Sequence, residues 1–133
     1  MTADRQSDVV AQAPRLVDVS EKVVLELFEG LRHEGERDLS HSVFDLRVWG
    51  MCDCGTCGSF RTRPRLRGER PKSSASLSER RTVTSIPLAV LPGWTVVDVT
   101  LAQPREIAFV EILDRPEIAD ELHRGLIAAR SRE

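Results

Sequence analysis

The chain of 133 residues contains no long hydrophobic run. No apolar stretch approaches the ~20 residues that a transmembrane helix needs, and the N-terminal segment lacks the apolar core of a secretory signal peptide. We therefore expect a cytoplasmic protein that does not span a membrane and whose thiols stay reduced. Hydrophobic residues form 41% and charged residues 30% of the chain, which indicates a folded soluble domain rather than a disordered one.

Motifs of hydrolases, kinases and nucleotide-binding proteins are also missing from the sequence. Three carboxylates, Asp98, Glu111 and Asp114, fall on or beside neighbouring predicted strands and could approach one another. No nucleophile, histidine pair or phosphate loop accompanies them, and such rows are usually the solvent-facing positions of a sheet. The sequence therefore favours a non-enzymatic role over an enzymatic one.

Helical periodicity is confined to the two ends of the chain. Residues 19–33 carry apolar side chains at helical spacing, and Asp18 with Glu21 has the spacing of a capping pair. Pro116 is placed to begin a second amphipathic helix. The apolar face of this second helix comprises Ile118, Ala119, Leu122, Leu126 and Ala129.

The segments between these helices have the pattern of strands. Apolar residues alternate along 43–51, which is the period of a half-buried strand. Residues 59–62 are expected to return antiparallel to it, so that 52–58 form a hairpin tip in which Gly55 and Gly58 adopt positive φ. Three further strands with short connections form a meander, at 83–91, 94–101 and 106–113.

The order of these elements contains no βαβ alternation and no internal repeat. It predicts an α+β fold in which an antiparallel sheet of four to five strands has an N-terminal and a C-terminal helix packed on one face. We expect residues 1–17 to form a flexible tail and residues 18–133 a single domain. A flexible Arg/Ser-rich loop is expected within this domain at about 63–81.

Two stretches of the chain resemble parts of known families. The runs Trp94-Thr-Val-Val-Asp98-Val and Ile107-Ala-Phe-Val-Glu111-Ile-Leu-Asp114 resemble a family of small uncharacterised bacterial domains. In that family a strand ending in Asp is followed by a turn and an Ile-x-Gly-Ile-Glu-Ile-Leu-Asp strand, and Phe109 stands here where the family has glycine. The stretch CDCGTCGSF is similar to short Cys-Gly loops in small actinobacterial proteins. The resemblance implies an antiparallel hairpin and no particular activity.

The chain has only three cysteines, and all of them lie within six residues, as Cys52, Cys54 and Cys57. A disulfide framework would spread its cysteines over the domain, so this cluster points to another chemistry. Thiolates are soft ligands for Zn²⁺, Cu(I) or an iron–sulfur cluster, and a glycine-containing turn can direct them at one point. The leading hypothesis is an intracellular, non-enzymatic binding or interaction module with one structural metal ion, most simply zinc, in this loop.

A structural zinc site normally has four ligands, and the sequence leaves the fourth open. His41 is not expected to bind, because a straight strand over 43–51 would place it on the order of 30 Å from the loop. His33 has the same handicap, and the side chain of Asp53 should point away from its two neighbouring cysteines. His123 reaches the loop only if the final helix meets the hairpin tip. Water and a second protein chain are further options.

Two other interpretations of the cysteines stay open. Arg61 and Arg63 follow the loop, and nearby cations lower the pKa of a thiol and raise its reactivity. Cys54 and Cys57 could then cycle as a C-x-x-C dithiol, although a thioredoxin-like motif begins a helix within a parallel α/β unit, and neither is predicted here. In the third interpretation the cysteines are reduced, inert members of a glycine turn.

Charge is distributed unevenly along the chain. The stretch 61–81 carries +6, whereas the rest of the chain carries −8. Its basic residues are candidates for binding a polyanion; they are Arg61, Arg63, Arg65, Arg67, Arg70, Lys72, Arg80 and Arg81. Stacking aromatics are missing from it. A flexible solvated loop is therefore favoured, and a nucleic-acid or protein adaptor is the alternative. The sequence names no partner; a protein or a second copy of the chain ranks above nucleic acid.

Overall fold

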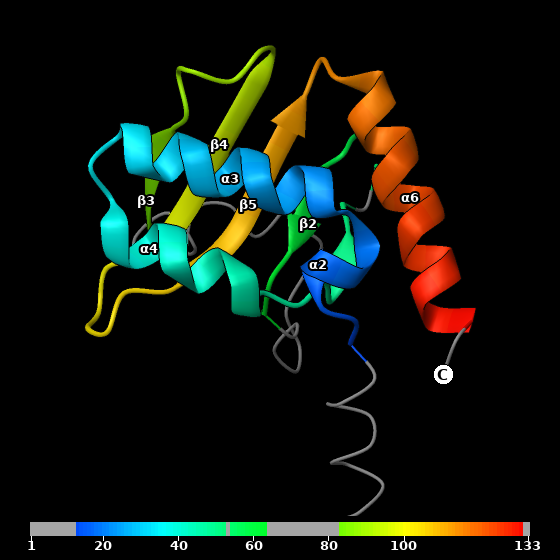
Figure 1. The fold of residues 1–133 in the computed structure, drawn as a ribbon, viewed down its shortest axis with the longest axis horizontal. Helices are drawn as coiled ribbons and strands as arrows, with labels where there is room; N and C mark the ends of the chain where they lie inside the picture. Colours follow the sequence, from blue (N-terminus) through cyan, green and yellow to red (C-terminus); the bar gives the residue numbers. More distant parts are fainter. Residues whose placement is uncertain (1–12, 53, 64–82, 132–133) are drawn as a thin grey trace, which may run out of the picture.

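The computed structural model describes residues 13–52, 54–63 and 83–131, and Figure 1 shows their arrangement. The elements in chain order are α2 (Leu16–Val19), α3 (Glu21–His33), α4 (Arg37–Ser42), the 3₁₀ helix η1 (Val43–Asp45), β1 (Gly50–Met51), β2 (Phe60–Arg61), β3 (Val83–Pro87), β4 (Trp94–Thr100), β5 (Ile107–Leu113) and α6 (Pro116–Ser131). No helix among these is both long enough and apolar enough to cross a membrane.

The five strands form one antiparallel sheet in the order β1-β2-β5-β4-β3. The predicted meander is confirmed as β3, β4 and β5. The predicted hairpin is confirmed as β1 and β2, and it joins the sheet through the pairing of β2 with β5. Asp98 is buried rather than solvent-facing, and its carboxylate accepts a hydrogen bond of 2.6 Å from the Ser85 hydroxyl. The α+β class predicted from the element order is confirmed.

One hydrophobic core joins the helices to the sheet. Leu27 of α3, Val110 of β5 and Leu122 of α6 all belong to it and are almost completely buried. In Figure 1 α3 crosses in front of the strands, and α6 stands beside the β2–β5 side of the sheet. The apolar face predicted for the C-terminal helix is the face that α6 buries. Helices α3 and α6 therefore share one hydrophobic core with the sheet.

Helix α3 begins two residues later than the sequence pattern predicts. Ser20 is its N-cap, and the Ser20 hydroxyl accepts a hydrogen bond of 3.2 Å from the Val23 amide. Asp18, the predicted cap, instead lies inside the short helix α2. The separate turn forms because the Leu16 side chain is completely buried and its amide donates to the Leu46 carbonyl at 2.7 Å. Tertiary packing thus moved the cap by two positions.

The predicted strand over 43–51 is wrong except at its end. The chain forms α4 and η1 up to residue 45, and strand geometry begins only at Gly50. The physical reason is that Leu39, Val43 and Leu46 also follow helical spacing, and all three are buried. Phe44, which a strand would have buried, is 38% exposed and packs its ring against Phe28.

Residues 13–17, which the sequence assigns to the tail, are packed against the domain. Ala13 is buried, and its carbonyl accepts a hydrogen bond from the Arg47 guanidinium. The Val48 amide donates to the Pro14 carbonyl at 2.8 Å. The tail predicted for residues 1–12 and the flexible loop predicted for 64–80 lie outside the described residues.

Candidate metal centre

The three cysteines occupy the tip of the β1–β2 hairpin. The pairs Gly50↔Arg61 and Met51↔Phe60 bring the two strands together, and the Cys52 amide donates to the Ser59 carbonyl at 2.8 Å. The hairpin predicted from the sequence is thereby confirmed. Gly55 adopts φ +77°, which a side chain would disfavour, so its predicted role is confirmed as well.

Gly58 has a different role from the predicted one. It is not among the described residues with positive φ. A Cβ at Gly58 would stand 3.4 Å from both Ala119 Cα and the Ile112 side chain, which is ordinary van der Waals contact, so the loop lies directly against α6 and β5 here. The Gly58 amide donates to the Ile112 carbonyl at 3.2 Å, and the Ser59 hydroxyl accepts from the Ile112 amide at 2.9 Å. The end of the loop that leads into β2 is therefore anchored to β5.

The sulfur atoms of Cys52, Cys54 and Cys57 converge. All three lie within 4.8 Å of one another, and the Sγ atoms of Cys54 and Cys57 are 3.3 Å apart. A tetrahedral zinc ion with Zn–S bonds of about 2.3 Å separates its thiolates by ~3.8 Å. The loop therefore presents three soft ligand atoms at the spacing of a single metal ion. No disulfide joins them.

The loop backbone stabilises a thiolate at Cys54. Its Sγ accepts hydrogen bonds from the Thr56 amide at 3.5 Å, the Cys57 amide at 3.4 Å and the Thr56 hydroxyl at 3.6 Å. These bonds, with the Thr56 amide as the largest contribution, lower the pKa of the Cys54 thiol to about 6. The causes lie within the loop, and the predicted contribution of Arg61 and Arg63 to this pKa is not among them.

Cys52 has the opposite electrostatics. Burial raises the pKa of its thiol to about 11, and hydrogen bonds with Cys54 and Cys57 contribute less. The loop thus combines one exposed sulfur that ionises readily with one half-buried sulfur that holds its proton. A bound cation would have to displace this proton, as metal binding to thiols generally does.

His123 lies beside the cysteine loop. The final helix therefore meets the hairpin tip, which is the condition under which the sequence allowed His123 to be a ligand. His123 projects from α6, and its Nε2 is 3.1 Å from the carbonyl oxygen of Cys57. His41 lies on α4 with its ring edge-on to Phe28. The predicted distance from His41 to the cysteine loop assumed a straight strand over 43–51, and that strand does not form. Within the described residues the converging ligand atoms are the three cysteine sulfurs alone. Asp53 lies outside the described residues.

The basic residues predicted to bind a polyanion are only partly placed. Arg61 lies on β2, and a Cβ at Gly50 would stand 3.1 Å from its Cζ, so its guanidinium covers the glycine of β1. Arg63 lines a cavity described below. The other six lie outside the described residues, and polyanion binding stays a prediction.

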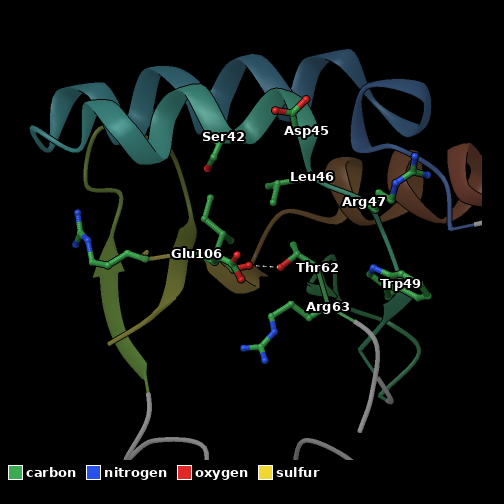
Figure 2. A pocket seen from close by; sticks show the side chains of 10 residues that line it. Ser42, Asp45, Leu46, Arg47, Trp49, Thr62, Arg63 and Glu106 are labelled. Carbon is green, nitrogen blue, oxygen red and sulfur yellow. Dashed lines mark hydrogen bonds between the residues drawn. The ribbon is translucent and has the colours of Figure 1, made fainter. Parts of the chain in front are cut away.

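A cavity of about 260 Å³ lies between the α4–η1 segment and the sheet. Figure 2 shows Ser42 and Leu46 approaching it from the helical side, and Thr62, Arg63 and Glu106 from the opposite side. Its lining contains no cysteine or histidine and mixes charges of both signs. The sequence could not indicate this cavity, because its residues come from separate segments that only the fold brings together.

Comparison of the chain with protein-family models, curated proteins and solved structures gives no match in any of the three. The resemblance to small bacterial domains therefore stays a prediction. The sequence did not indicate the groups that donate to the Cys54 sulfur, which are the Thr56 amide and hydroxyl and the Cys57 amide. It also did not indicate the Ser59 hydroxyl, which accepts from the Ile112 amide. The Thr between the cysteines and the Ser after them were the only signals for the two hydroxyls.

Proposed function

We propose that this protein is a non-enzymatic zinc-binding domain in which Cys52, Cys54 and Cys57 hold one ion. The observation that carries the proposal is the convergence of the three sulfur atoms within 4.8 Å of one another. Three thiols in contact, without a disulfide, are suited to sharing one cation.

The chemistry of the loop supports zinc among the soft ions. Zn²⁺ has no geometric preference of its own, so it accepts three thiolates from a short loop and a fourth ligand from elsewhere. Three thiolates around a divalent ion leave a net negative charge. The amides of Thr56 and Cys57, which point at the Cys54 sulfur, offset this charge. Cu(I) is the competing soft ion, and the experiment below includes it.

The role that follows for the ion is to fix the hairpin tip as a binding surface. Cys54 is exposed at this tip, so a partner would contact the loop directly. Coordination would remove the conformational freedom of the loop before a partner binds and so reduce the entropic cost of association. The partner is a second protein or a second copy of this chain.

Elemental analysis tests the proposal on full-length protein prepared anaerobically without chelator. We expect about one zinc per chain, with copper measured in the same sample. The Cys54→Ser variant should lose the ion, because a hydroxyl is a far poorer zinc ligand than a thiolate. Its thermal unfolding should be unchanged in the metal-free state, since none of the three cysteines is among the described core residues. Protein without metal that also fails to bind added Co²⁺ would overturn the proposal.

A second candidate function, thiol–disulfide exchange, rests on the 3.3 Å separation of the Cys54 and Cys57 sulfurs. The Cys54 thiolate would attack a low-molecular-weight disulfide, forming a mixed disulfide and releasing one thiolate, which takes up a proton. Cys57, losing its proton, would then attack the Cys54 sulfur, close the intramolecular disulfide and release the second thiol. The chain loses two electrons, and the reagent gains them.

Oxidised glutathione separates the two functions. For exchange we expect two glutathione molecules released per chain, and a Cys57→Ser variant that stops at the mixed disulfide. Cys52→Ser is the matched control, because it should exchange like the wild type. Protein that contains zinc as purified and does not react until the zinc is removed supports the metal-binding function instead.

A further inference from the structure

The three-cysteine site lacks a fourth ligand, which structural zinc sites almost always have. The sequence contains no fourth cysteine, and its only histidines are His33, His41 and His123. Cys₃His is a common structural zinc set, so each histidine can be judged by its position.

Two of these histidines are held elsewhere. His33 is the last residue of α3. His41 lies near the end of α4, where its ring packs edge-on against Phe28 with 5.8 Å between the ring centroids. None of the three histidines contributes a ligand atom to the converging group as it stands, so the choice depends on which of them lies next to the loop.

His123 is presented to the loop by the packing of α6. Ala119 and His123 are four residues apart, so they lie on the same face of the helix. Ala119 is where α6 approaches Gly58, and one turn later the His123 imidazole meets the Cys57 carbonyl at 3.1 Å. The neighbouring Leu122 is completely buried and fixes the helix in this position. The imidazole therefore contacts the same residue that supplies one of the sulfurs.

We propose that His123 is the fourth ligand of the metal ion, an inference that rests on the proposed zinc site. The carbonyl that its Nε2 contacts belongs to Cys57, which also supplies one of the sulfurs, so the imidazole already lies beside the site. Rotation about the His123 side-chain bonds is the movement by which a ring nitrogen would reach the ion. This movement gives up the hydrogen bond to the Cys57 carbonyl and gains a metal–nitrogen bond. The ring is half-buried, and the contact that it would give up is with a backbone carbonyl. The ion would then tie the hairpin to α6.

Co²⁺ bound in place of zinc tests this inference, because its visible spectrum reports both the thiolates and the geometry of the site. In His123→Ala the sulfur-to-cobalt charge-transfer bands should persist, since the three thiolates remain. The ligand-field bands should shift, and zinc affinity should fall by at least about tenfold. His41→Ala is the matched control and should retain the wild-type spectrum and affinity.

His123→Gln separates a ligand from a residue that only positions Cys57. A glutamine amide can donate to the Cys57 carbonyl but is a poor zinc ligand, so His123→Gln should behave like His123→Ala. A wild-type spectrum and affinity in His123→Gln would overturn the inference and leave His123 as a hydrogen-bond donor. As a direct readout, the ¹⁵N resonance of one His123 ring nitrogen should shift on addition of zinc.

The two proposals fail in different ways. A wild-type chain that binds neither cobalt nor zinc overturns the metal site, and the role of His123 with it. A wild-type chain that binds cobalt with the same spectrum and affinity as His123→Ala overturns only the inference about His123.

Discussion

Replacing Gly125 with alanine tests how closely α6 packs on α2. A Cβ at this position would overlap the carbonyl oxygen of Val19 and stand 3.0 Å from its carbonyl carbon. Both atoms are backbone, so no side-chain rotation relieves the overlap. The α2 backbone is held by the 2.7 Å hydrogen bond from the Leu16 amide to Leu46, and Leu126 anchors α6 in the core. The two helices must therefore separate.

Two opposing contributions set the magnitude for Gly125→Ala. Alanine stabilises a helix interior by about 1 kcal/mol relative to glycine. Overpacking costs about 1–3 kcal/mol, and a backbone overlap belongs at or above the upper end. We expect a net loss of about 2 kcal/mol in the free energy of unfolding, which for a domain of this size lowers Tm by about 6–10 °C.

Gly30→Ala is the matched control, because Gly30 also lies inside a helix, α3. Its added Cβ would meet the buried Leu88 side chain, with Cδ1 at 2.9 Å and Cβ at 3.2 Å, and no backbone atom lies among these contacts, so a small shift of one side chain relieves them. The same gain in helix propensity applies, so its stability should change by less than about 1 kcal/mol. Urea denaturation followed by circular dichroism measures both variants. If Gly125→Ala is as stable as Gly30→Ala, the close approach of the two helices is refuted.

Three further predictions concern the thiols, a buried ion pair and the excluded histidine. In metal-free protein, iodoacetamide should alkylate Cys54 at half its maximal rate near pH 6, and Cys52 should reach half its maximal rate only as the pH approaches 11. Mass spectrometry measures both rates, and coincident pH profiles for the two cysteines would contradict the loop electrostatics. Glu26→Ala should cost about 2–3 kcal/mol in chemical denaturation, because Arg115, with 7% of its side chain exposed, loses the carboxylate at 2.5 Å and keeps only the longer contact of 3.6 Å with the exposed Glu117. A change under about 0.5 kcal/mol would show that the pair contributes little. His41→Ala should keep its full metal content by elemental analysis, and metal loss with an intact fold would place His41 in the site.

The elements predicted correctly are those whose residue pattern fits only one type of secondary structure. The runs that became β4 and β5 are too rich in β-branched residues for a competing helix, and Gly93, with φ +70°, supplies the turn before β4. Helix α6 buries the five residues that helical spacing assigned to its apolar face. These local signals sufficed because no tertiary contact opposed them.

The prediction failed where one set of residues fits two periods. Alternation through Phe44, Leu46 and Val48 suggested a strand, but Leu39 and Val43 extend the same stretch at helical spacing. Which period wins depends on the core that the helix meets, and a short window of sequence does not contain that information.

The candidate ligands of the site were predictable from the sequence, whereas the contacts around them were not. The close spacing of the three cysteines in the sequence is enough to mark them as candidate ligands. The contact of His123 with Cys57, by contrast, depends on how α6 packs against the hairpin, and the amide donors to Cys54 depend on the turn geometry. The source of the lowered Cys54 pKa was therefore assigned to the nearest arginines in the sequence rather than to the loop backbone.

The strand order β1-β2-β5-β4-β3 leads us to expect an order in which the strands pair during folding. The strands of the meander are neighbours in the chain, whereas Phe60 of β2 pairs with Val110 of β5, about 50 residues away. Closing so long a loop is slow compared with forming a hairpin. The three sulfurs, in contrast, sit within six residues of one hairpin and need no distant contact to meet. If the proposed ion is present during synthesis, the hairpin would bind it first, and the sheet and α6 would then close onto an assembled centre.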